Sequence, residues 1–168
     1  MILGMSTSAF TTLHVVLSLV GIATGLVVAA GMFGSKRLDG WTAIFLATTI
    51  LTSVTGYFFP ADRVLPSHIV GAISLVVLAV ATIAFYRYRL EGAARGLYVI
   101  TALIALYLNV FVLVVQGFLK VPALKALAPT QSEPPFLVTQ AVVLAAFVAI
   151  AIGAFKSFRP ATLERFSP

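Results

Sequence analysis

Long runs of apolar residues alternate with short polar clusters along the whole chain. Five runs have about the 20 residues that a helix needs to cross a hydrocarbon core roughly 30 Å thick. They cover residues 9–33, 41–59, 67–86, 96–118 and 136–155. Glycine or proline stands in every cluster between them, where helix breakers are expected. The pattern therefore predicts an all-α integral membrane bundle of five transmembrane helices, folded as a single domain over residues 1–168.

The connection between the fourth and fifth runs is the longest one. Within residues 121–128, Pro122 suits a helix start, Lys125 lies among leucines, and Pro129 follows as a stop. This pattern is typical of a short helix on a membrane surface, and we expect it at the outer surface. A loop of this kind is either functional or a simple tie that rests on lipid.

The composition agrees with a membrane protein. Of the 168 residues, 61% are hydrophobic and 10% are charged, whereas about 25% are charged in soluble domains. The chain has no cysteine, which excludes disulfides, thiolate metal sites, c-type haem attachment and iron–sulfur clusters. No basic region precedes the first run, so we expect that run to remain as a span and not to be removed as a signal peptide.

Lys and Arg outnumber Asp and Glu by 11 to 5. The basic residues flank the apolar runs and form no continuous stripe, so they indicate orientation, and we expect no nucleic acid partner. Five spans put eight of them on one side: Lys36, Arg37, Arg87, Arg89, Arg95, Lys156, Arg159 and Arg165. The other side holds Arg63, Lys120 and Lys125. The positive-inside rule then predicts that the N-terminus lies outside and the C-terminus in the cytoplasm.

The two histidines are the first candidates for chemistry. His14 shares one helix face with Ser18, Gly21 and Gly25, which follow it at offsets of four, three and four. His68 stands in the first turn of the third run, at a depth similar to that of His14. Two imidazoles on separate helices suit a b-type haem, and the glycines would leave space for a porphyrin face. The alternative is that the small residues only allow close helix packing.

A metal site is a second interpretation of the same histidines. Asp62 and Glu133, in the outer loops, would add carboxylate oxygens to the two imidazoles, a donor set that suits zinc, copper or iron. Both carboxylates also have simpler explanations. Asp62 precedes Arg63 and can pair with it, and Glu133 stands before a helix start, where a carboxylate is favoured by the helix dipole.

Polar side chains at a similar outer depth extend the candidate site. Asn109 and Gln116 are seven residues apart and share a face of the fourth run. Amides in hydrocarbon usually turn inward and bond across helices. The candidate ligand-binding cluster consists of His14, Tyr57, His68, Asn109, Gln116 and Gln140. Such a cluster would hold a quinone head, whose carbonyls accept hydrogen bonds, or would only join the helices to one another.

The second run carries hydroxyl side chains on two neighbouring faces. Thr48, Thr52 and Thr55 lie on one face, and Thr49 and Ser53 lie on the next. We expect this surface to contact another helix closely, with the hydroxyls bonded back to their own helix. An N-cap is expected just ahead of this run, at residue 39, which is an aspartate.

Several catalytic signatures are absent from the sequence. It contains no phosphate-cradling glycine loop, no His-Glu-x-x-His, no Gly-x-Ser-x-Gly and no charge at the middle of a predicted span. ATP-driven transport, intramembrane metalloproteolysis and proton pumping are therefore disfavoured.

Three segments carry a resemblance to a known group. Residues 38–43 (LDGWTA), 52–56 (TSVTG) and 128–136 (APTQSEPPF) resemble an uncharacterised family of small multi-pass inner-membrane proteins from proteobacteria. The resemblance implies a bacterial inner membrane and supplies no activity, cofactor or site.

The sequence thus predicts a non-catalytic inner-membrane protein with the lipid bilayer as its surroundings. Its polar cluster would bind a small hydrophobic ligand, a partner membrane protein or a second copy of the chain. The alternative is an electron-transfer protein with b-type haem on His14 and His68 that interacts with quinol. A small transporter is a further alternative.

Overall fold

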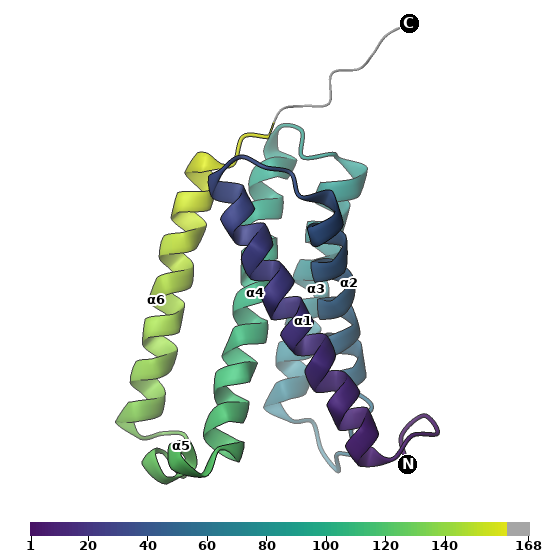
Figure 1. Cartoon of the computed structure of the whole chain (residues 1–168), viewed down its shortest axis with the longest axis vertical. Helices are drawn as coiled ribbons and strands as arrows, with labels where there is room; N and C mark the ends of the chain where they lie inside the picture. The colour runs from purple at the N-terminus through teal and green to yellow at the C-terminus, as the bar shows by residue number, and fades with distance from the viewer. Residues whose placement is uncertain (161–168) are drawn as a thin grey trace, which may run out of the picture.

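The computed structural model describes residues 1–160, and Arg165 of the charge count lies outside the described residues. The elements are α1 (Thr7–Phe33), α2 (Asp39–Gly56), α3 (Pro66–Thr82), a π turn η1 (Ile83–Arg87) that continues α3, α4 (Ala93–Lys120), α5 (Pro122–Leu127) and α6 (Pro134–Ser157). Consecutive long helices run in opposite directions along the bundle (Figure 1). The prediction of an all-α helical bundle is therefore confirmed over these residues.

Among residues 1–160, four helices are long and apolar enough to cross a membrane: α1, α3 with η1, α4 and α6. The remaining long helix, α2, has 18 residues, of which five are threonine. It is not among the four, because its polar residues, Asp39 and the threonines among them, lower its mean hydropathy. The structure thus supports a membrane bundle with four candidate spans, and a fifth span at α2 stays a prediction.

The main core lies where α1, α2, α3, η1 and α4 meet. Phe45, Leu78, Phe85, Tyr98 and Leu106 are almost completely buried there. α1 lies against α2 and α4, and α6 packs mainly against α4 at the side of the bundle (Figure 1). The large apolar side chains that remain exposed along α1 and α6 suit a surface that faces lipid.

The predicted short helix forms at the end of α4. α5 starts at Pro122 and covers a small second core made by Phe118, Ala128 and Phe136. The rings of Phe118 and Phe136 meet edge to face, with centroids 5.4 Å apart. α5 therefore joins α4 to α6 by packing as well as by the chain.

Asp39 does not cap α2 as expected. It is the first residue of the helix, and the N-cap position belongs to Leu38, which makes no side-chain cap bond. The Asp39 carboxylate instead accepts a hydrogen bond from Arg37 Nε at 2.7 Å. The nearby guanidinium offers the carboxylate a charged donor, and the helix end is left without a side-chain cap.

Candidate functional site

His14 links α1 to α2. Its Nδ1 lies 2.8 Å from Thr55 Oγ1, and its ring meets Phe59 edge to face at a centroid distance of 5.2 Å. The Thr55 hydroxyl donates its proton to the backbone carbonyl of Leu51 at 2.7 Å. This arrangement favours the neutral tautomer in which His14 Nδ1 donates to Thr55 and Nε2 is the acceptor nitrogen of the ring.

Ser18 and Asn109 link α1 to α4 at the next level of the bundle. Ser18 Oγ donates to Asn109 Oδ1 at 2.7 Å, and Asn109 Nδ2 donates to the Ser18 carbonyl at 3.4 Å. Gln140 joins α6 to α4 through a bond from Nε2 to the Phe111 carbonyl at 3.3 Å. Asn109 and Gln140 thus bond across helices, as expected for amides in hydrocarbon.

The glycines below His14 are packing positions. A Cβ added at Gly21 would lie 2.9 Å from Thr49 Oγ1, and one added at Gly25 would lie 2.6 Å from Leu106 Cδ1. Neighbouring side chains therefore already fill the space in front of both glycines. These side chains leave no room for a porphyrin face. The two glycines therefore fit the interpretation that small residues allow close helix packing.

Tyr57 and His68 form a separate pair. Tyr57 Oη donates to the His68 carbonyl at 2.6 Å, and the two rings stack with centroids 5.4 Å apart. His68 Nδ1 accepts a bond from the Leu65 amide at 3.2 Å, at the start of α3. The Tyr57 ring also covers Gly71, at 3.2 Å from an added Cβ. The two histidines of the predicted cluster therefore have different partners: His14 contacts Thr55, and His68 contacts Tyr57.

The structure gathers no metal donor set of the expected kind. Within residues 1–160, no group of three or more His, Asp or Glu side chains lies close enough to hold a metal ion. Glu133 instead accepts bonds from Thr130 and Ser132 in its own loop.

A cleft of about 420 Å³ lies between α1 and α4. We call it the α1–α4 cleft; most of its wall is apolar, and its polar lining residues are Thr11, His14, Ser18, Gln116 and Lys120. Three apolar lining residues, Val15, Leu19 and Leu113, are exposed on the outer surface of the bundle. The cleft therefore opens on a side that would face lipid.

A smaller cavity of about 130 Å³ lies deeper, among α1, α2, α3 and α4. This polar cavity shares four lining residues with the cleft, namely Val112 and the polar residues His14, Ser18 and Gln116. Thr49 and Thr52 also line it, and their buried hydroxyls have no hydrogen-bond partner within the described part of the chain. A polar cavity of this size has room for ordered water molecules, which satisfy such groups.

The expectation for the α2 hydroxyls is confirmed only in part. Thr48, Ser53 and Thr55 donate to backbone carbonyls of their own helix. The expectation is wrong for Thr49 and Thr52, whose hydroxyls are without such a bond. These two hydroxyls therefore keep their hydrogen-bonding capacity for a group inside the polar cavity.

Of the six predicted residues, His14, Asn109 and Gln116 line the polar cavity, and His14 and Gln116 also line the cleft. Tyr57, His68 and Gln140 line neither of these two cavities. Lys120 also lines the cleft, although from the sequence alone it was considered only for the orientation of the chain. Its spacing of four residues from Gln116 puts both side chains on one face of α4 and could have identified it.

Comparison of the chain with protein-family models, with curated proteins and with solved structures finds no match. The function of the site therefore has to be inferred from its own chemistry.

Proposed function

We propose that the protein is a non-catalytic membrane protein that binds a small hydrophobic molecule with an oxygen-bearing head, of the quinone type, in the α1–α4 cleft. One observation carries the proposal: the wall of a mostly apolar cleft includes the polar residues His14, Ser18 and Gln116, which the cleft shares with the polar cavity. Its volume of about 420 Å³ lies within the range of roughly 300–1,000 Å³ typical of small-molecule sites.

The polar residues that line the cleft offer donors and an acceptor. The Gln116 amide and the Lys120 ammonium donate hydrogen bonds, which suit the carbonyl oxygens of a quinone. His14 Nε2 is an acceptor, which suits the hydroxyl of a quinol. Both redox forms of such a head would therefore find a partner in the cleft, while Val15, Leu19 and Leu113 contact its apolar tail.

The proposal includes a membrane topology. We place α2 as a fifth span beside the four apolar helices, with the N-terminus outside and the C-terminus in the cytoplasm of a bacterium. Thr42 and Thr49 on α2 are 1% exposed, whereas Ile44 and Leu51 are exposed. The threonines face the bundle and the apolar residues face outward, so the outer surface of α2 suits lipid although its mean hydropathy is low.

Ligand binding is tested on protein purified in mild detergent. Mass spectrometry of organic extracts should find a small hydrophobic molecule in a stoichiometric amount. Titration calorimetry with a short-chain benzoquinone should show binding to the wild type. Gln116→Leu should weaken it about five-fold, the effect of losing one hydrogen bond worth about 1 kcal/mol. Gln140→Leu is the matched control, because Gln140 lines neither the cleft nor the polar cavity.

Equal quinone affinity for the wild type and Gln116→Leu, together with no ligand in the extracts, would contradict the proposal. A Soret absorption band that is lost in both His14→Ala and His68→Ala would instead support the haem alternative. A larger assembly that survives gentle solubilisation, with no small ligand, would instead support a partner membrane protein or a second copy of the chain.

A further inference from the structure

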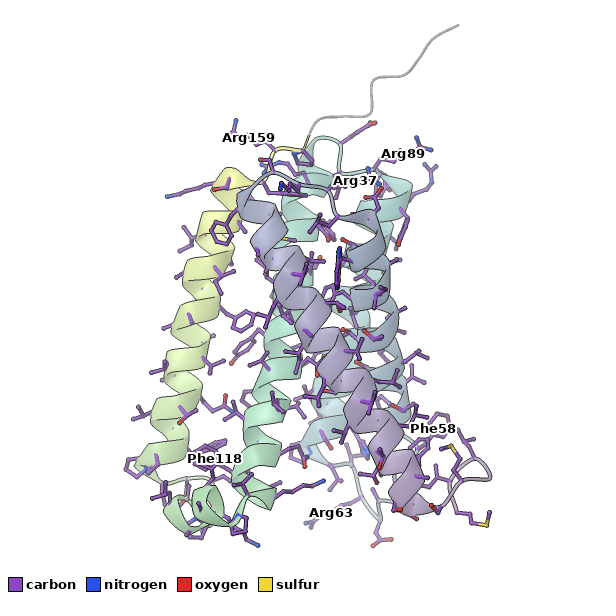
Figure 2. All side chains as sticks on the ribbon, viewed as in Figure 1. Arg37, Phe58, Arg63, Arg89, Phe118 and Arg159 are labelled. Atoms are coloured by element: carbon purple, nitrogen blue, oxygen red, sulfur yellow. The ribbon has the colours of Figure 1, made fainter. Side chains whose placement is uncertain are left out.

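Four arginines meet at the end of the bundle opposite α5. Arg37 comes from the connection between α1 and α2, Arg89 from the turn after η1, Arg95 from the first turns of α4, and Arg159 from the chain after α6. Together they line a pocket of about 430 Å³, which we call the arginine pocket. Figure 2 shows Arg37, Arg89 and Arg159 at the same end, far from Arg63.

The charges of this pocket are poorly balanced. Its lining holds four arginines and one acidic residue, Glu91, so its formal charge is 4 − 1 = +3. Within residues 1–160, the salt bridge between Arg37 and Asp39 is the only one. Like charges around one pocket repel one another, and an anion in the pocket would reduce this repulsion.

Two of the guanidinium groups are held in fixed positions. Arg37 lies over the Phe85 ring, 4.6 Å from its centroid. Arg95 Nη1 donates to the carbonyls of Phe155 and Phe158 at 3.1 and 2.6 Å. A guanidinium has five N–H donors, so both groups keep donors for a ligand. Ordered arginines with free donors recognise phosphate oxygens well, often through two parallel bonds.

An apolar groove continues from the arginine pocket along α4. This α4 groove has a volume of about 660 Å³ and shares Glu91, Gly92 and Arg95 with the pocket. Leu97 and Ile100 line it further along, and Phe155 of α6 closes its side. Leu97 and Ile100 are exposed, so the groove is open to a chain that lies along the surface of the bundle.

We propose that the arginine pocket and the α4 groove bind one anionic phospholipid, with its phosphate among the arginines and an acyl chain along Leu97 and Ile100. The continuity of a basic pocket with an apolar groove favours a lipid, because a free phosphate would use only the pocket. Basic pockets between membrane helices on the cytoplasmic side bind lipid headgroups in this way. The proposal rests on the membrane placement of the bundle and is independent of the ligand in the α1–α4 cleft.

The test compares two variants with the same loss of charge at the same end of the molecule. Arg89→Gln with Arg159→Gln removes two pocket charges, and Arg87→Gln with Lys156→Gln removes two charges outside the pocket. All four residues are exposed, so both variants should fold. Native mass spectrometry measures the retention of phosphatidylglycerol, with phosphatidylcholine as the neutral reference. The pocket variant should bind phosphatidylglycerol about 30-fold more weakly, as expected for the loss of two charge-assisted bonds to the phosphate, and the control variant should weaken this binding less than three-fold.

Equal weakening in both variants would overturn the proposal, because it would show a general attraction to basic residues and no site. The source of the phosphate is tested with Ile100→Gln and with inorganic phosphate as a competitor. A bound lipid should be weakened by Ile100→Gln and should resist millimolar phosphate. Displacement by phosphate, with no effect of Ile100→Gln, would show that the pocket takes a free anion and that the lipid assignment is wrong.

Discussion

A methyl group at Gly25 would lie 2.6 Å from Leu106 Cδ1 and 2.9 Å from Phe45 Cδ2. Leu106 and Phe45 are each 1% exposed, so neither side chain has open space into which it can move. α1 thus approaches α2 and α4 closely because this residue has no side chain. The same absence of side chains at Gly21 lets Asn109 lie close enough to bond Ser18.

Gly25→Ala should therefore destabilise the bundle. We expect a loss of about 1–3 kcal/mol in the free energy of unfolding, the usual cost of overpacking a filled core. The measurement is reversible unfolding in detergent by denaturant or heat. Gly40→Ala is the matched control, because a Cβ there meets no atom within 4 Å, and it should be neutral or slightly stabilising. Equal stability of the two variants would show that α1 is not held by this contact.

The same residues show how far the sequence predicts the site. The offsets of four, three and four correctly place His14, Ser18, Gly21 and Gly25 on one face, because helix geometry fixes them. Depth along the helix does not fix the direction in which a ring points. His14 turns to Thr55, while Tyr57 stacks on His68. The spacing of residues in the sequence therefore could not predict which side chain each histidine contacts.

At the scale of elements, the apolar runs and the helix breakers between them predicted the positions of the long helices. The structure extends each run by a few residues at one or both ends, except at α2, which begins two residues earlier and ends three residues before the prediction. Asp39 and the threonines explain why the mean hydropathy of α2 does not identify it as a span, because this mean averages polar residues with exposed apolar residues such as Ile44 and Leu51. The two cavities were not predictable, because they depend on how α1 lies across α4, and no local pattern records that crossing.

The loop before α6 depends on one carboxylate. Glu133 accepts bonds from the Thr130 amide at 3.1 Å, the Thr130 hydroxyl at 2.9 Å and the Ser132 amide at 3.1 Å. Desolvation raises the pKa of Glu133, but these hydrogen bonds together lower it more, so its pKa lies below the ordinary value of 4.5. The charged carboxylate thus holds the loop in the form that leads into α6.

This pKa shift predicts how the loop responds to acid. Because the pKa is lower in the folded state, the stabilisation is present above pH 4.5 and is lost as the pH falls through the folded pKa. Hydrogen exchange of residues 130–136, corrected for the intrinsic effect of pH, should speed up in acid. Glu133→Gln should show this faster exchange already at pH 7, while Asp62→Asn, in the other loop, should not. Exchange of the Glu133→Gln loop at the wild-type rate would contradict the role of the carboxylate.

At the scale of the whole molecule, the two ends of the bundle differ in charge and in chemistry. One end carries the arginine pocket, and the other carries α5 and lies near the cleft residues His14 and Lys120. The two proposed ligands would therefore bind near opposite faces of the membrane, provided that all five long helices cross it. This condition depends on α2, whose 18 residues span about 27 Å at 1.5 Å per residue, close to the hydrocarbon thickness of about 30 Å.

The topology is tested with single cysteines, because the chain has none of its own. Asp62→Cys lies between α2 and α3, Ser132→Cys between α5 and α6, and Lys36→Cys between α1 and α2. If α2 crosses the membrane and the positive-inside rule holds, a membrane-impermeant maleimide should label Asp62→Cys and Ser132→Cys in intact spheroplasts. It should label Lys36→Cys only after permeabilisation.

The labelling pattern separates two errors in this topology. Labelling of Lys36→Cys alone in intact spheroplasts would mean that all five helices cross but that the orientation is reversed. Equal labelling of Asp62→Cys and Lys36→Cys would mean that α2 returns to the side from which it started. The loop after α2 and the arginine pocket would then face the same compartment, although they lie at opposite ends of the bundle (Figure 2). That result would require the bundle to rearrange in the membrane, and it would remove the basis for placing the cleft and the pocket on opposite sides.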